Sequence, residues 1–85
     1  MLKGQDIALV MKIMVSQQLG RPLEYAVLAY ELYISQSEVS KGMLRLEKAK
    51  IISRYPDKGL EVHKHALFEM LVHGLKYFMT AELNI

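Results

Sequence analysis

The chain contains no cysteine. This absence excludes a disulfide framework, a redox-active thiol and a cysteine-based zinc site. The chain also has no run of about eighteen apolar residues, the length that marks a membrane-spanning helix. Its first residues include Gln5 and Asp6 and lack the basic, then apolar, pattern of a secretory signal. We therefore expect a soluble, cytoplasmic protein.

Motifs of the common enzyme classes are missing as well. There is no glycine-rich phosphate loop, no nucleophile elbow and no pair of carboxylates in a catalytic setting. His65 and His73 are spaced so that on a helix about 12 Å would separate their Cα atoms. His63 lies close to His65, but no cysteine or carboxylate completes a ligand set with them. We expect no enzyme activity, no cofactor and no metal site.

The charge of this short chain is unevenly distributed. Its 85 residues are enough for one domain with a modest core. Residues 35–58 carry six basic and three acidic side chains, a net charge of +3, whereas the whole chain has +2. Such a segment is typical of a surface that meets nucleic-acid phosphates, although an ordinary solvated surface has the same composition.

Hydrophobic periodicity and turn residues predict a mainly α-helical chain. The first helix is expected to bury an apolar face made of Ile7, Val10, Met11 and Met14. Pro56-Asp57-Lys58-Gly59 is a strong turn signal between two short strands. The expected helices span about 4–18, 25–33, 36–49 and 64–81, and the expected strands span about 51–55 and 60–62.

The segment from Leu28 to Lys41 has the pattern of a helix-turn-helix. Ser35-Gln36-Ser37-Glu38 matches a capping box, in which the serine hydroxyl accepts from the glutamate amide and the carboxylate reaches back to the serine amide. The box sets the start of the second helix, and the small Ala29 lets the two helices approach. The second helix would then present its first turns to the major groove of DNA.

Residues 24–62 resemble the DNA-binding core of bacterial winged helix-turn-helix regulators of the MarR type. The residues that carry this resemblance are Leu28, Ala29, Leu32, Ile34, Ser35, Ser37, Val39, Ser40, Lys41, Arg45, Leu46, Glu47, Ile51 and Ile52. The resemblance implies one domain over 1–85 that regulates transcription by binding duplex DNA. Its helix-turn-helix would span about 25–49, its wing about 51–62 and its C-terminal helix about 64–81.

Two positions depart from the pattern of that family. Tyr33 replaces a glycine common in the turn, and Lys50 stands where a glycine often ends the recognition helix. A side chain at either position costs energy if the backbone φ is positive.

The helix-turn-helix interpretation assigns DNA contacts to particular residues. The residues expected to contact base edges are Gln36, Ser37, Ser40 and Lys41. The residues expected to contact the DNA backbone, either from the helix or from the wing, are Arg45, Lys48, Arg54 and Lys58. Two alternatives remain open at this point. The domain could bind another protein, as the apolar Val27 and Tyr33 suggest, or it could be the N-terminal domain of a longer protein. The sequence identifies no small-molecule effector.

The last helix carries more large apolar residues than one neighbouring helix can cover. In MarR-type proteins the terminal helices build a dimer, so the resemblance implies a homodimer through about 1–18 and 64–85. The expected interface residues are Leu71, Leu75 and Phe78, with Leu9 and Ile13 of the first helix on the other side of the seam. Gly74 could allow a close helix approach there. Tyr30 and its apolar neighbours either join a partner surface or cover the edge of the core.

Overall fold

The computed structural model describes residues 2–83, with side chains described for residues 2–74. This part of the chain is mainly helical, with four helices and one antiparallel hairpin, as expected. The elements are α1 (Gly4–Gln18), α2 (Tyr25–Leu32), α3 (Gln36–Lys48), β1 (Ile52–Tyr55), β2 (Gly59–Val62) and α4 (Lys64–Leu83). Each begins and ends within two residues of the sequence prediction. The arrangement is compatible with a winged helix.

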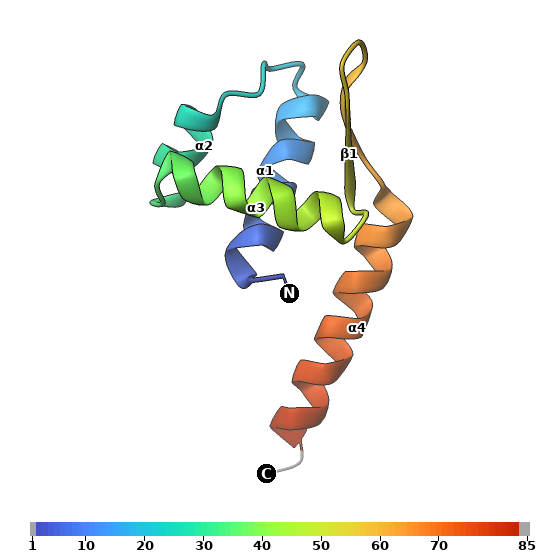
Figure 1. Cartoon of the computed structure of the whole chain (residues 1–85). Coiled ribbons are helices and arrows are strands. Elements are labelled where there is room, and N and C mark those ends of the chain that lie inside the picture. The colour runs from blue at the N-terminus through green and yellow to red at the C-terminus, as the bar shows by residue number, and fades with distance from the viewer. Residues whose placement is uncertain (1, 84–85) are drawn as a thin grey trace.

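The elements form a compact body from which one helix projects (Figure 1). Helices α1, α2 and α3 pack together, and α3 crosses in front of α1 in the view shown. The hairpin stands beside the C-terminal end of α3. Helix α4 leaves the base of the hairpin and extends away from the body, which gives the molecule a longest dimension of 47 Å.

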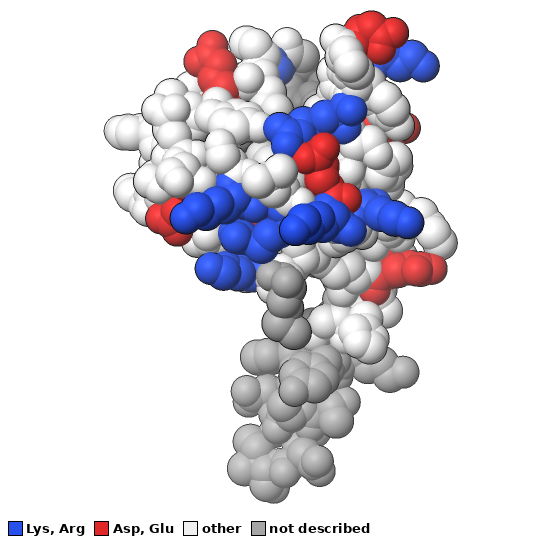
Figure 2. Space-filling model, viewed as in Figure 1, with Lys and Arg blue, Asp and Glu red and all other residues white. Residues whose placement is uncertain are grey.

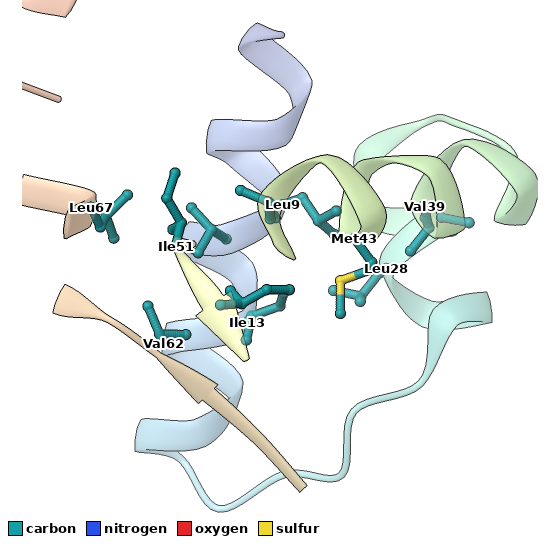
Figure 3. Close-up of a cluster of buried hydrophobic side chains, with 12 residues drawn as sticks. Leu9, Ile13, Leu28, Val39, Met43, Ile51, Val62 and Leu67 are labelled. Carbon is teal, nitrogen blue, oxygen red and sulfur yellow. The ribbon is translucent and has the colours of Figure 1, made fainter. Parts of the chain in front are cut away.

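The core is a single cluster to which every element contributes (Figure 3). Its buried members are Leu9, Val10, Ile13, Leu28, Ala29, Val39, Met43, Leu46, Ile51, Ile52, Val62 and Leu67. In the close-up, side chains of α1, α2 and α3 meet those of the hairpin and of the first turn of α4. Of α4, Leu67 is buried, and Met70 and Leu71 are half-buried against the cluster.

The predicted orientation of α1 is only partly correct. Val10 is buried and Met14 is half-buried against the core, as expected. Leu9 and Ile13, expected at a dimer seam, are buried in the core, whereas Met11, expected in the core, is 48% exposed. The physical reason is that α1 has apolar residues on nearly all sides, so periodicity alone does not fix which side turns inward. The inward side also includes Asp6, which a hydrophobicity pattern assigns to solvent and which is 1% exposed.

The turn between α2 and α3 matches the sequence prediction in two respects. Tyr33 ends α2 in the left-handed region with φ of 58°, so the predicted cost of a side chain there, about 1–2 kcal/mol, applies. Ser35 then caps α3, because its hydroxyl accepts from the amide of Glu38 at 3.0 Å. The Glu38 carboxylate accepts from the side chain of Gln5 in α1 at 3.5 Å, a contact between helices instead of the expected bond to Ser35.

The hairpin is fixed to the helices at both of its ends. Lys50, between α3 and β1, has φ of 61°, a left-handed conformation that is unfavourable for a residue with a side chain. The strands pair in register from Ile52 opposite Val62 to Tyr55 opposite Gly59. Near the tip, the side chain of Gln17 at the end of α1 donates to the carbonyl of Leu60 at 2.9 Å. The hairpin is therefore held against α1 as well as α3.

Candidate nucleic-acid interface

The outward face of α3 is the exposed polar face that the sequence prediction assigned to DNA. Gln36, Ser37, Ser40 and Lys41 are all exposed, as an interface with DNA requires. The buried residues of the same helix are Val39, Gly42, Met43 and Leu46. Residues that point directly away from the core therefore recur every three or four positions along α3. This outermost stripe consists of Ser37, Lys41, Leu44 and Lys48.

Basic side chains gather in a belt over α3 and the residues that follow it (Figure 2). This region of the sequence contains Lys41, Arg45, Lys48 and Lys50. Lys41 and Lys48 are exposed, and among the described residues neither takes part in an ion pair. Their charges are therefore directed to solvent, where a phosphate could meet them.

Arg45 has a structural partner that the sequence did not reveal. Its guanidinium donates to both carboxylate oxygens of Asp6, from Nε at 2.7 Å and from Nη2 at 2.8 Å. Asp6 also accepts from the backbone amide of Lys3 at 2.8 Å, which caps the start of α1. Burial raises the pKa of the Asp6 carboxyl, but the hydrogen bonds from Arg45 and Lys3 outweigh it and lower this pKa below its ordinary value. Arg45 thus joins α1 to α3.

Arg54 and Lys58, the predicted contacts from the hairpin, differ in their surroundings. Arg54 pairs with Glu47 of α3 and donates to the hydroxyl of Tyr25 at 3.0 Å. The hydrogen bond from Arg54 lowers the pKa of the Glu47 carboxyl, which stays charged and offsets part of the positive belt. Lys58 is exposed at the turn of the hairpin. Of the four residues predicted to contact the DNA backbone, Lys48 and Lys58 are the two whose charge is not engaged within the described chain.

A cleft of about 440 Å³ lies between the end of α1, the segment that leads to α2, and the hairpin. Ile13 and Met43 form part of its wall, and its lining includes three basic residues and no acidic residue: Arg21, Arg54 and Lys58. Of these three residues, Arg54 is paired with Glu47, whereas Arg21 and Lys58 are exposed.

The histidines have ordinary structural surroundings. His63 is half-buried, and its Nε2 lies 2.6 Å from the hydroxyl of Ser53 across the hairpin. His65 pairs with Glu69 one turn along α4. Within the described residues, no three histidine, aspartate or glutamate side chains come together as a metal site would require. No described helix has the length and apolarity needed to span a bilayer.

Several apolar side chains are exposed on α1, α2 and α4, the helices that do not carry the basic belt. Met11 and Val15 of α1 and Leu19 directly after it follow one another along the outer side, and on α4 Phe68 and Val72 do the same. The expected dimer residue Leu71 is half-buried against the core, and the side chains of Leu75 and Phe78 lie outside the described part of α4. On α2, the exposed residues are Val27, Tyr30 and, at its end, Tyr33.

Sequence reasoning missed two residues of this region. Asp6 lies 39 residues from its partner Arg45, and no local pattern marks such a pair. Leu44 was passed over because the motif directs attention to the first turns of α3, although its spacing from Ser37 and Lys41 places it on the same stripe. Comparison of the chain with protein-family models, curated proteins and solved structures gives no match. We therefore infer the function from the geometry of α3 and the hairpin.

Proposed function

We propose that this chain is a winged helix-turn-helix protein of the MarR type that binds duplex DNA sequence-specifically and regulates transcription as a homodimer in the cytoplasm. The observation that carries the proposal is the exposed face of α3. This helix is capped by Ser35, lies directly after a tight turn, and directs Lys41 and Lys48 to solvent. In helix-turn-helix proteins the second helix enters the major groove with such a face.

In the proposed complex the contacts divide by their chemistry. Gln36, Ser37, Ser40 and Lys41 meet base edges, and a glutamine side chain can bond the N6 and N7 atoms of adenine. Lys48 and Lys58 meet phosphates, one from α3 and one from the wing formed by β1 and β2. Arg45 and Arg54 have a different main task, because Asp6 and Glu47 hold them in place beside the interface.

Binding of a random-sequence duplex pool at about 50 and about 200 mM salt tests the proposal. We expect affinity to fall steeply with salt, because bound phosphates release counterions. Lys48→Ala and Lys58→Ala, which each remove a proposed phosphate contact, should each reduce the slope of log affinity against log salt by roughly 0.9. Arg45→Ala is not used, because its effect on binding is mixed with an effect on folding.

Lys12→Ala is the matched control for charge. It removes one positive charge from α1. Lys12 lies outside α3 and pairs with Glu31 of α2 at a distance of 3.5 Å. This variant should keep the salt slope of the parent chain. Equal slopes for the parent chain and for a Lys41→Ala/Lys48→Ala double variant would contradict the assignment of α3 to DNA.

The homodimer is proposed through the outer side of α1 and the exposed side of α4. Met11, Val15 and Phe68 are each about half exposed or more, and a large apolar surface of this kind is usually covered by a partner. These residues replace Leu9 and Ile13, which belong to the core. A two-fold axis through the terminal helices would place two α3 helices on successive turns of a palindromic site.

Sedimentation at micromolar concentration tests the dimer. The parent chain should sediment at twice its 9.8 kDa mass, and Val15→Glu should give a monomer, because Val15 is 56% exposed and its substitution places a charge in the seam without disturbing the core. Ala26→Glu, at an exposed position of α2, should remain dimeric. A parent chain that sediments as a monomer would remove the dimer from the proposal.

A protein–protein interaction module is the second candidate, and the tyrosines of α2 favour it. Tyr30 and Tyr33 are 83% and 96% exposed, and tyrosine is enriched at protein interfaces. The salt experiment separates the two candidates, since a surface built only for a protein partner has no reason to bind random duplex DNA with a steep salt dependence.

A further inference from the structure

Leu44 is the one apolar residue in the outermost stripe of α3. It is 53% exposed, whereas Met43 and Leu46 on either side of it are completely buried. Leu44 belongs neither to the core cluster nor to the half-buried side chains that pack against it. The packing of the core therefore does not require a leucine at this position.

The neighbours of Leu44 are the residues assigned to DNA. Lys41 lies one turn before it and Lys48 one turn after it, and Ser40 lies beside it. If Lys41 meets a base edge and Lys48 a phosphate, the side chain of Leu44 lies between them on the floor of the major groove.

The chemistry of the major groove selects what a leucine can contact there. Three of the four bases present only hydrogen-bond donors and acceptors at that edge, and a leucine against them would remove water without replacing its bonds. Thymine alone adds an apolar group, the C5-methyl. Packing a leucine on this methyl group buries apolar surface on both partners.

We propose that Leu44 is a specificity-determining residue that packs on the C5-methyl group of a thymine in the bound site. This inference rests on the proposed DNA-binding function and names one base that the site must contain. Lys41 and the polar residues before it contact the base pairs on one side of that thymine, and Lys48 holds the backbone on the other side.

The experiment removes the methyl group alone. A duplex selected from the random pool is resynthesised with each thymine replaced, one at a time, by deoxyuridine, which keeps every hydrogen-bonding group of the base. Loss of one buried methyl group should weaken binding about four-fold, and loss at both halves of a palindrome about fifteen-fold. The Leu44→Ala variant should bind the parent duplex more weakly and be insensitive to deoxyuridine at the same thymine.

Val27→Ala is the matched control, because it shortens an exposed apolar side chain of α2, outside the residues assigned to DNA, and leaves Leu44 in place. This variant should keep the sensitivity to deoxyuridine, and thermal melting should show that both variants fold. The inference is overturned if no deoxyuridine substitution weakens the parent chain, or if Leu44→Ala remains sensitive at that thymine. A chain that selects no duplex at all overturns the DNA-binding proposal together with this one, so the two failures are distinguishable.

Discussion

Replacing Arg45 by alanine should lower the free energy of unfolding by about 1–3 kcal/mol, the cost of leaving a buried acceptor without its partner, as measured by urea denaturation at neutral pH. The reason is the state in which the substitution leaves Asp6. This carboxylate is 1% exposed and receives two hydrogen bonds from the Arg45 guanidinium. Without them a buried negative charge keeps only the backbone bond from Lys3. Because domains of this size are marginally stable, this loss is a sizeable fraction of the total and should lower the melting temperature measurably.

Three further variants identify the cause. Asp6→Ala should cost less, because the Arg45 side chain is 22% exposed and can reach water. The Asp6→Ala/Arg45→Ala double variant should be more stable than Arg45→Ala alone, which is the signature of a coupled pair. Lys12→Ala breaks the exposed pair with Glu31 and should cost less than about 1 kcal/mol. If Arg45→Ala lowered the free energy of unfolding by less than about 1 kcal/mol, the ion pair between Asp6 and Arg45 would not support the fold.

The pH dependence of the same variants has a definite sign. In the folded parent chain the pKa of Asp6 lies below its ordinary value, so the pair contributes stability above the unfolded-state pKa of about 3.9 and loses it as pH falls through the folded pKa. In Arg45→Ala the Asp6 carboxylate is still buried but has lost the hydrogen bonds from Arg45 that favour its charged form. The pKa of Asp6 should therefore be higher in this variant than in the parent chain. The difference in stability between the parent chain and Arg45→Ala should therefore narrow as pH falls below about 4.

Local signals account for what the sequence predicted correctly. Ser35 marks the start of α3, and Pro56 with Gly59 marks the turn of the hairpin, because caps and turns depend on residues close together in the chain. The positive φ values of Tyr33 and Lys50 could likewise be anticipated, since each stands where a glycine is common. Element bounds followed from these positions.

Non-local contacts account for what the sequence did not predict. The orientation of α1 depends on Asp6, and Asp6 is buried only because Arg45 arrives from α3. The roles expected for Arg45 and Arg54 were assigned from charge alone, whereas an ion pair with a carboxylate of another helix or strand decides where each guanidinium points. The polar residues of the first turns of α3 were predicted as an exposed set, and they are exposed, because their positions follow from the cap.

The contact between α1 and α3 depends on a residue without a side chain. Gly42 lies in α3 opposite Asp6 and Leu9, and a Cβ atom there would come within 2.9 Å of the Leu9 Cδ2 and 3.0 Å of the Asp6 Oδ1. Neither neighbour can move easily, since Leu9 is buried in the core and Asp6 is held by Arg45. Interiors are packed too densely to accept added carbon atoms without strain.

Gly42→Val should therefore lower the free energy of unfolding by about 3 kcal/mol, at the upper end of the usual cost of overpacking a core. Gly74→Val is the matched control, because Gly74 also lies inside a helix and has no neighbour within 4 Å of a Cβ atom among the described residues. Valine has a slightly higher helix propensity than glycine, so the control should change stability by no more than about 0.5 kcal/mol. Both values come from urea denaturation of the purified variants. If Gly42→Val were as stable as Gly74→Val, α1 and α3 would not approach as closely as the Asp6–Arg45 pair requires.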